Sequence, residues 1–314
     1  MKRFIKYCLL FTLPVYLLLT VVDYRFSQTA KRSSDYSIEA WYDIMNGVID
    51  ADVVVMGSSR AWEHVNPLIL DSVLEVNSYN LGIDGRSFDS QILKYHLYRE
   101  RNTKPQLIIQ NVDIFSLIHR VGIKKIQFFP YFWDKPIRDT FFPVEPFTVW
   151  EKYLPMYRFL HVNARSDMPG LSVFLPDGTK TLTKGYKGEE LSWNGRALSA
   201  VDSIPFLVND TTARMFKDYL AEVKADGIKM VFVFSPLFIE ATKKISGMKD
   251  VYAYFQKIAS EYDIPILDYT YMGLCNDTTY FYNGMHLNKR GSDIFSDSLA
   301  CDIKRLGVLK EKKK

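Results

Sequence analysis

Residues 51 to 62, ADVVVMGSSRAW, constrain the fold most, because a short apolar run ends there at a glycine. A continuous apolar run such as 53–56, bounded by glycine, is typical of a strand that is buried on both faces of a parallel sheet. Open α/β sheets carry their chemistry just beyond the carboxyl ends of such strands. Ser58 and Ser59 follow Gly57 at that point, so either is a candidate nucleophile. Alternatively, these residues form only a strand-to-helix turn with an N-cap.

Four further predicted strands follow, with helical patterns between them. The predicted strands are 76–82, 106–112, 229–234 and 264–268. The predicted helices are 87–101, 209 or 211 to about 225, 249–262 and 289–306. Strand, helix and strand with short joins are typical of a parallel sheet with right-handed crossovers. We therefore predict an α/β fold, a three-layer doubly wound parallel sheet of the flavodoxin-like kind.

The periodicity fails between about residues 122 and 205, where prolines, aromatic residues and glycines are frequent. Within this stretch, Pro176-Asp177-Gly178 is a strong turn signal, and its flanks, 172–174 and 179–183, predict a hairpin. A stretch of this length is too long for a loop in a compact domain. We predict an insertion that packs over the carboxyl edge of the sheet and shapes the access of substrate.

The N-terminus carries an apolar run from Tyr7 to Val22 that residues 23–25 close. Three basic residues precede it: Lys2, Arg3 and Lys6. The run is at the short end for a spanning helix, and the best small-residue cleavage pattern, at 27–30, lies beyond two charged residues. We predict an uncleaved signal anchor over 1–25, with a cleaved signal as the alternative. Positive charge before the run places the body, 26–314, outside the cytoplasm.

Composition favours a folded body and gives no reason to expect nucleic-acid binding. The chain is 47% hydrophobic, and its formal charge of +4 is concentrated at the two ends. Cys8, Cys275 and Cys301 form no CxxC pair and have no companion histidine spacing, so we expect neither a metal nor a cofactor. Cys275 and Cys301 either form a disulfide outside the cytoplasm or are two buried thiols.

A serine nucleophile needs a base within hydrogen-bond reach, and that base is most often a histidine. The chain has five histidines. His64, His96, His119 and His161 lie in predicted helices or in the insertion, where a surface or packed role is expected. His286 instead follows the last predicted strand and precedes the final helix. A doubly wound sheet therefore brings His286 to the same edge as the serines.

Three motifs, in this order along the chain, resemble the SGNH (GDSL-type) hydrolase superfamily. They are Gly57-Ser58-Ser59, Asn80-Leu81-Gly82-Ile83-Asp84-Gly85 and Asn283-x-x-His286-Leu-Asn-x-x-Gly291. The resemblance spans nearly the whole body except the insertion. The anchor, the GSSR form of the first motif and the Ser-Pro-Leu after the fourth strand are similar, more narrowly, to membrane-anchored bacterial members linked to cell-surface O-acylation. Examples are the D-alanine transfer and alginate acetylation proteins.

The resemblance implies a role for each matching residue. Ser59 takes the position of the nucleophile, and Ser58 replaces the usual aspartate. His286 takes the position of the base. Arg60 brings a cation to the same edge of the sheet and is a candidate for binding substrate.

The resemblance also implies donors for an oxyanion. They are the backbone N–H groups of Ser59 and Gly85, with Gly82 as the alternative. The family supplies a further asparagine after the third strand. Here Asn111 or Asp113 is the candidate for that place.

Asn283 departs from the family pattern, which has an aspartate three residues before the histidine. An asparagine accepts a hydrogen bond but brings no negative charge, and it can favour the wrong imidazole tautomer. In a serine protease triad the equivalent change lowers turnover by about four orders of magnitude. Either a Ser59–His286 dyad works with another partner, such as Asp277 or a backbone carbonyl, or the protein is weakly active or inactive.

Two functions agree with this pattern. The first is an extracytoplasmic acyl-ester hydrolase or O-acyltransferase that acts on cell-envelope glycans through an acyl-enzyme at Ser59. Its expected partners are an acylated glycan or acyl donor, the inner membrane and a membrane-bound acyltransferase. The alternative, favoured by Asn283, is an SGNH-fold binding or scaffold protein that presents a glycan or acyl carrier to such an acyltransferase.

Overall fold

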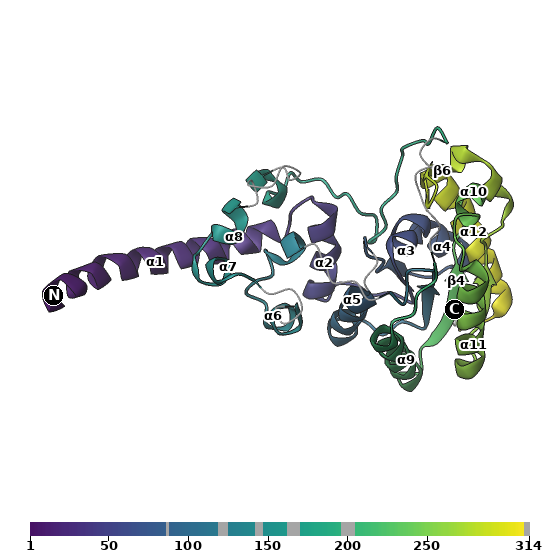
Figure 1. Ribbon diagram of the computed structural model, residues 1–314, viewed down its shortest axis with the longest axis horizontal. Coiled ribbons are helices and arrows are strands. Elements are labelled where there is room, and N and C mark those ends of the chain that lie inside the picture. Colours follow the sequence, from purple (N-terminus) through teal and green to yellow (C-terminus); the bar gives the residue numbers. More distant parts are fainter. Residues whose placement is uncertain (86–87, 119–124, 142–146, 162–169, 196–204, 311–314) are drawn as a thin grey trace. The chain divides into compact units, whose positions relative to one another are not determined.

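The computed structural model describes residues 1–85, 88–118, 125–141, 147–161, 170–195 and 205–310. The chain divides into two compact units (Figure 1). Unit 1 comprises residues 1–42 and 121–181, and unit 2 comprises residues 43–120 and 182–314. The chain passes from the first unit to the second inside α2 (Tyr36–Asn46).

Unit 2 is built on five parallel strands in the order β2-β1-β3-β4-β5. The strands are β1 (Val53–Met56), β2 (Ser78–Asn80), β3 (Leu107–Asn111), β4 (Lys229–Phe234) and β5 (Ile266–Asp268). This order is the flavodoxin-like one, in which the first strand lies inside the sheet. The predicted doubly wound parallel sheet is confirmed, and all five strands lie within the predicted runs.

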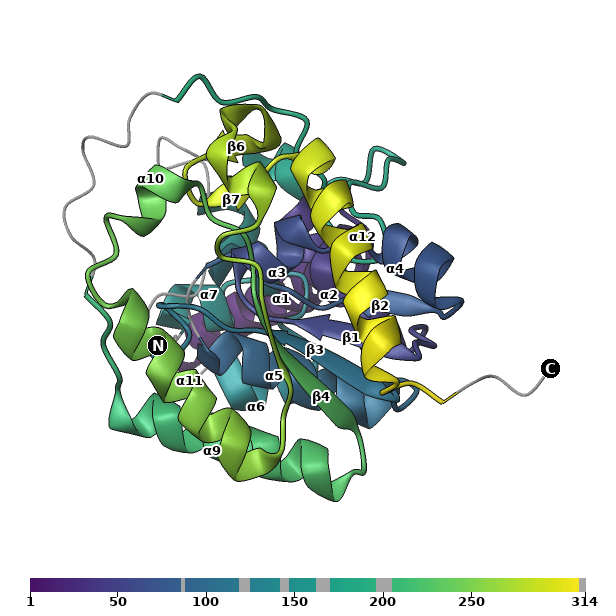
Figure 2. The same ribbon diagram turned by 90° about the vertical axis from the view of Figure 1, so that its right-hand side faces the viewer.

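Helices cover both faces of this sheet, so the predicted three layers are present (Figure 2). One face carries α3 (Ser59–His64), α4 (Pro67–Leu74) and α12 (Lys289–Leu306). The other face carries α5 (Phe88–Arg101), α9 (Asp210–Ala225) and α11 (Met248–Tyr262). On the first face, Val55 shares a buried cluster with Phe295 of α12. On the second, the ring of Phe232 packs against Phe216 of α9 and Phe255 of α11.

Short elements follow β4 and β5: the first lies between β4 and α11, and the others lie between β5 and α12. They are α10 (Ile239–Thr242), the 3₁₀ helices η5 (Gly273–Asn276) and η6 (Thr278–Tyr280), β6 (Phe281–Asn283) and β7 (His286–Leu287). The last two strands form an antiparallel ribbon in which Asn283 pairs with His286. This ribbon holds His286 directly before α12.

Unit 1 consists of α1 (Lys2–Ala30), the first part of α2 and an aromatic-rich segment. The other elements are η1 (Lys125–Phe128), α6 (Lys135–Phe141), α7 (Val149–Tyr153), α8 (Tyr157–Leu160) and η3 (Gly170–Phe174). Aromatic rings form its core: Phe159 packs against Phe26 of α1 at 4.8 Å and against Phe174 at 4.9 Å between centroids. The exposed, apolar α1 is long enough to cross a membrane.

The helix α1 extends beyond the apolar run that residues 23–25 close, because it continues to Ala30. The Asp23 carboxylate is fully buried and accepts hydrogen bonds from both terminal nitrogens of Arg158, at 2.7 and 2.5 Å. A carboxylate neutralised in this way need not lie at a solvated helix end.

The prediction of a hairpin around residues 176–178 is wrong. Its first flank is the 3₁₀ helix η3, although the turn itself is present, with Gly178 at a φ of +84°. Asp177 accepts the backbone N–H of Thr179 at 2.8 Å and the hydroxyl of Ser34. The turn therefore binds the segment before α2 instead of pairing its own flanks.

The predicted insertion at 122–205 falls in both units. Its residues up to 181 lie in unit 1, whereas 182–195 lie in unit 2. The division into an anchor over 1–25 and a body over 26–314 stays a prediction, as does the packing of the insertion over the sheet.

Candidate active site

The carboxyl end of β1 turns into α3 at Gly57. This glycine has a φ of +148°, and a Cβ there would lie 2.7 Å from the Cβ of Ala61 and 2.8 Å from that of Asn111. Any larger residue would therefore push α3 away from the sheet. Ser58 is the N-cap of α3 and is buried, whereas Ser59 is its first residue and is partly exposed.

The two serines have different partners. The Oγ of Ser59 lies 2.8 Å from the Nε2 of His286, and the side chain of His286 is 21% exposed. The Oγ of Ser58 donates instead to the carboxylate of Asp113 at 2.8 Å. Of the two candidate nucleophiles, Ser59 is thus the one placed against an imidazole that solvent can reach.

Asn283 fixes the tautomer of this imidazole. Its Oδ1 accepts the backbone N–H of Met285 at 2.9 Å and lies 3.1 Å from the Nδ1 of His286. The Met285 donor requires the amide oxygen, and not the NH₂ group, at this position, so the Nδ1 of His286 must donate. The Nε2 then carries the lone pair that faces Ser59. Asn283 therefore favours the productive tautomer, although it brings no charge.

A carboxylate that the sequence did not indicate, Glu63, lies beside the same imidazole. Its Oε2 is 3.9 Å from the Nε2 of His286 and accepts a hydrogen bond from the hydroxyl of Tyr282. The ring of Tyr282 stacks on that of His286, with 5.5 Å between centroids and 15° between planes. Burial raises the pKa of Glu63 to about 7. Glu63 follows Ser59 by four residues on one helix face, and this spacing could have revealed it.

His64 connects α3 with Leu287, the residue that follows His286. It is fully buried, and its Nε2 accepts the backbone N–H of Leu287 at 3.1 Å. The hydroxyl of Ser292 donates to its backbone carbonyl at 2.9 Å. Burial holds the pKa of His64 well below its usual range, so the ring is neutral and can accept. The sequence left a surface or a packed role open for His64, and it did not indicate that this residue positions the ribbon carrying His286.

Arg60 and Asp113 form a buried ion pair behind the serines. The guanidinium Nη2 lies 2.9 Å from the Oδ2 of Asp113, and both side chains are at most 6% exposed. The other carboxylate oxygen accepts the backbone N–H of Phe115 at 2.6 Å. Together with Ser58, the pair ties the start of α3 to the end of β3. The structure thus places Arg60 and Asp113 as supports of the turn, away from open solvent.

The candidate oxyanion donors differ in their hydrogen bonds. The N–H of Gly82 donates to the Oδ1 of Asn80 at 2.8 Å. The amide nitrogen of Asn111 donates to the backbone of β4 at 3.2 Å and to the hydroxyl of Ser235. Gly85 lies exposed in the loop after β2, with a φ of +108° and open space at its Cβ position. The loop at Gly85 is thus the more accessible of the two glycine candidates.

The alternative partner Asp277 lies elsewhere on the loop. Its carboxylate caps η6 by accepting the backbone N–H of Thr279 at 2.9 Å. The acidic side chain that the structure places beside His286 is Glu63.

A strap formed by residues 182–195 borders the site. The N–H of Lys187 donates to the carbonyl of Trp62 at 3.2 Å, and the N–H of Trp193 donates to that of Phe281 at 3.1 Å. The ammonium of Lys187 lies 3.7 Å from the Oε1 of Glu63. The later part of the predicted insertion therefore contacts both α3 and β6.

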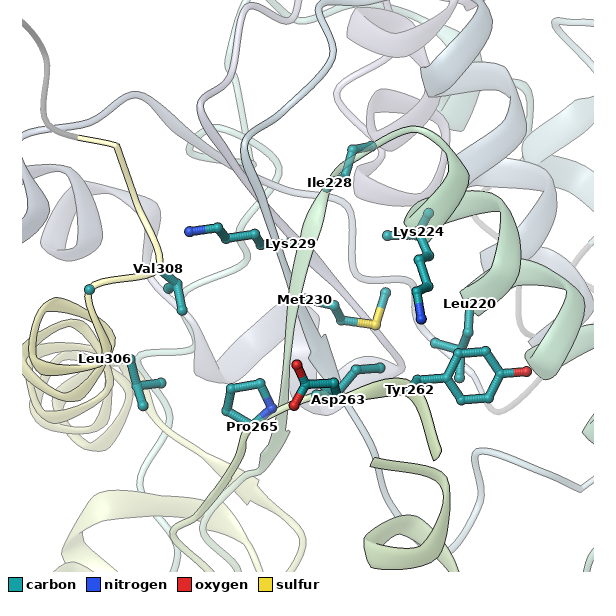
Figure 3. Close-up of a pocket in the computed structure, with 13 residues that line it drawn as sticks. Leu220, Lys224, Ile228, Lys229, Met230, Tyr262, Asp263, Pro265, Leu306 and Val308 are labelled. Carbon is teal, nitrogen blue, oxygen red and sulfur yellow. The ribbon is translucent and has the colours of Figure 1, made fainter. Parts of the chain in front are cut away.

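A cavity of about 460 Å³ lies away from these residues (Figure 3). Lys229 and Pro265, at the starts of β4 and β5, line it together with the C-terminal ends of α9, α11 and α12. It therefore opens at the amino edge of the sheet, whereas Ser59 follows the carboxyl end of β1.

The cysteines are free thiols, with Cys275 buried and Cys301 half-buried. Burial raises the pKa of the Cys275 thiol to about 11. Over the described ranges, no group of three or more His, Cys, Asp or Glu side chains is arranged to hold a metal ion.

No family model matches the sequence, and no curated protein matches it. Among solved structures, 23 chains are similar to it. One is a "putative acylhydrolase" from Bacteroides fragilis, with 14% identity and a TM-score of 0.39 over 81% of this chain and 86% of that one. A second is a "putative lipolytic protein of G-D-S-L family" from Desulfitobacterium hafniense, with 12% identity and a TM-score of 0.39 over 79% and 97%. A third is a "possible lipase" from Chitinophaga pinensis, with 11% identity and a TM-score of 0.38 over 82% and 100%.

Proposed function

We propose that this protein is a membrane-anchored, extracytoplasmic serine esterase or O-acyltransferase that acts on acylated glycans of the cell envelope. The observation that carries the proposal is the 2.8 Å contact between the Oγ of Ser59 and the Nε2 of His286 at the carboxyl edge of the sheet. A hydroxyl and an imidazole within hydrogen-bond reach are the minimum for nucleophilic acyl transfer. The lipolytic and acylhydrolase descriptions of the similar structures agree with this class of reaction.

The reaction follows from the geometry of three side chains. The Oγ of Ser59 attacks the ester carbonyl while the Nε2 of His286 takes its proton. Asn283 holds the proton on Nδ1, so the imidazolium that forms has both nitrogens protonated. The tetrahedral intermediate collapses to the Ser59 ester, and His286 returns the proton to the leaving alcohol. Water or a sugar hydroxyl then attacks this ester while His286 takes its proton. His286 returns that proton to the Oγ of Ser59 as the acid (hydrolysis) or the new ester (transfer) is released.

The proposed oxyanion donors are the backbone N–H groups of Ser59 and Gly85. Ser59 is the first residue of α3, so its N–H has no acceptor within the helix. The helix N-terminus also favours negative charge at this point. A donor of this kind contributes about 3–4 kcal/mol to transition-state stabilisation in known enzymes.

Glu63 supplies the negative charge that Asn283 lacks. When ionised, it stabilises an imidazolium whose Nε2 lies 3.9 Å away. Tyr282 fixes the position of both partners, because its hydroxyl binds Glu63 and its ring stacks on His286. The charge thus acts from the Nε2 side of the ring instead of from Nδ1.

We expect Glu63→Gln to change the pH dependence of p-nitrophenyl acetate hydrolysis. Because the pKa of Glu63 is raised to about 7, this carboxylate is neutral in acid and gains its charge as the pH rises through 7. The variant should match the wild type at acidic pH and fall about ten-fold below it in kcat/KM once Glu63 would be ionised, a difference of 1.4 kcal/mol. The matched control is Glu189→Gln, which removes a carboxylate that pairs with Lys187 at 3.0 Å. A parallel loss at every pH would contradict the electrostatic role.

We propose that α1 stays attached as a signal anchor. The buried side chains of Asp23 and Ser27 both bind Arg158, and Phe26 packs on Phe159. Cleavage at residues 27–30 would therefore remove part of the core of unit 1. Basic residues at positions 2, 3 and 6 favour a cytoplasmic N-terminus and an extracytoplasmic body.

A fluorophosphonate probe tests the proposal, because it labels only an activated serine. We expect the folded full chain to be labelled, Ser59→Ala to be unlabelled and Ser58→Ala to remain labelled. Ser58→Ala is the matched control, since that hydroxyl faces Asp113 and not the imidazole. Mass spectrometry of the modified peptide identifies the serine. A label on any other residue would refute the assignment.

The scaffold function remains the second candidate, and the uncharged side chain of Asn283 is the observation that favours it. A scaffold would present a glycan or an acyl carrier to a membrane-bound acyltransferase without forming an ester itself. It predicts a folded chain that the probe does not label, with labelling gained in Asn283→Asp.

A further inference from the structure

Unit 1 exposes apolar side chains on α7, on α8 and at Leu154 between them. These side chains, called the α7–α8 face below, are those of Val149, Trp150, Tyr153, Leu154 and Leu160, which are 66%, 63%, 67%, 44% and 56% exposed. Five large apolar side chains that are this exposed within twelve residues are unusual on a surface that meets only water. A partner that excludes water is therefore expected over them.

The α7–α8 face lies beside the apolar part of α1. The hydroxyl of Tyr16 donates to the backbone carbonyl of Tyr153 at 3.1 Å. Figures 1 and 2 both show α7 next to α1. The side chains of α1 from Arg3 to Leu19 are exposed, and the first fully buried one after them is Asp23. The contact at Tyr16 thus lies seven residues, about 10 Å, before the point where α1 enters the core of unit 1.

The length of α1 determines whether lipid or water surrounds the contact between Tyr16 and Tyr153. A bilayer core of about 30 Å requires about 20 helical residues. Counting back from Asp23, such a span reaches Arg3 and contains Tyr16. If the bilayer ended before α7, only residues 4–15, between the charged Arg3 and Tyr16, would lie within it, about 18 Å of helix. That length is too short to cross, so the bilayer must extend past Tyr16 to the level of Tyr153.

We propose that the α7–α8 face inserts into the outer leaflet of the membrane beside α1. The proposal rests on the membrane-spanning role of α1 proposed above, and it names lipid as the partner of this face. The depth of about 10 Å agrees with the 5–10 Å to which interfacial helices bury their apolar sides. Trp150 and Tyr153 are the residue types that gather at membrane interfaces, and the exposed Lys152 between them can extend to the lipid headgroups.

Quenching by brominated lipid tests the proposal. The full chain is reconstituted into phosphatidylcholine vesicles with or without bromine on the acyl chains, and tryptophan emission is compared. We expect brominated lipid to quench the wild type and Trp150→Phe to lose most of the quenched component. The matched control is Trp193→Phe, in unit 2, which should lose emission but keep the quenched component. Trp150 is largely exposed, so phenylalanine there preserves both the fold and the apolar face.

Two results would overturn the proposal. Equal quenching in the wild type and Trp150→Phe would show that lipid does not contact this face. The same would follow if a second copy or another protein covered Trp150 and kept brominated lipid from quenching its emission. Release of the chain from vesicles by alkaline carbonate would refute the spanning role of α1 as well. None of these readouts depends on esterase activity, so failure of the Ser59 chemistry would be seen separately.

Discussion

Replacing Ser59 by alanine is expected to lower kcat/KM for p-nitrophenyl acetate hydrolysis by about 10⁴-fold or more. In serine hydrolases with a complete triad, loss of the nucleophile costs about 10⁶-fold in turnover. An amide in place of the orienting carboxylate costs about 10⁴-fold there, because the imidazole adopts the wrong tautomer. In this protein Asn283 holds the Nδ1 proton, because its oxygen is fixed by the N–H of Met285. The loss of rate that a wrong tautomer causes is therefore not expected here. Ser59→Ala should then lose most of the rate that a serine nucleophile provides.

The same assay on three further variants shows whether the two residues act as a unit. His286→Ala should fall as far as Ser59→Ala, and the double variant should fall no further, because either change alone removes the whole nucleophilic route. Ser58→Ala should keep most of the activity, since its hydroxyl supports the turn through Asp113. Activity of Ser59→Ala within ten-fold of the wild type would exclude a Ser59 ester as the main route.

The sheet could be predicted because each of its strands has a local signal. The apolar run 53–56 ends at Gly57, and 229–234 is an apolar strand with the same bounds in the structure. Parallel strands with helical crossovers leave few topologies, so the edge shared by Ser59 and His286 followed from chain order alone. The contact itself required the ribbon β6–β7, which sets the direction of the imidazole.

The remaining features of the site depend on contacts between distant residues. Glu63 and Tyr282 meet across 219 positions, and a glutamate on a short polar helix is usually solvated. Its spacing of four from Ser59 was a usable signal, but its burial was not visible in the sequence. The core of unit 1 had no periodic signal at all, because its short helices and 3₁₀ turns pack aromatic rings instead of a helical stripe. The extension of α1 through Asp23 depends on Arg158, 135 residues away.

We expect Asp23→Ala to destabilise unit 1 by about 3–5 kcal/mol, because removing one partner of a buried ion pair leaves the other charge unpaired. Both side chains of the Asp23–Arg158 pair are at most 2% exposed. The guanidinium also donates to the carbonyl of Phe129 at 3.1 Å and to the hydroxyl of Ser27 at 2.8 Å, but these neutral groups cannot replace the lost carboxylate. Denaturant unfolding of the full chain in mild detergent, followed by tryptophan fluorescence, measures the change.

Two variants separate this ion pair from charge removal in general. Asp139→Ala removes an exposed carboxylate of the same unit that pairs with Lys135, and such pairs contribute about 1 kcal/mol at most. The double variant Asp23→Leu/Arg158→Met should recover much of the lost stability, because apolar side chains of similar size need no counter-charge. If Asp23→Ala cost no more than Asp139→Ala, then the end of α1 would not be part of the core of unit 1. Removal of α1 would then leave that core intact, which would contradict the proposal that α1 stays attached.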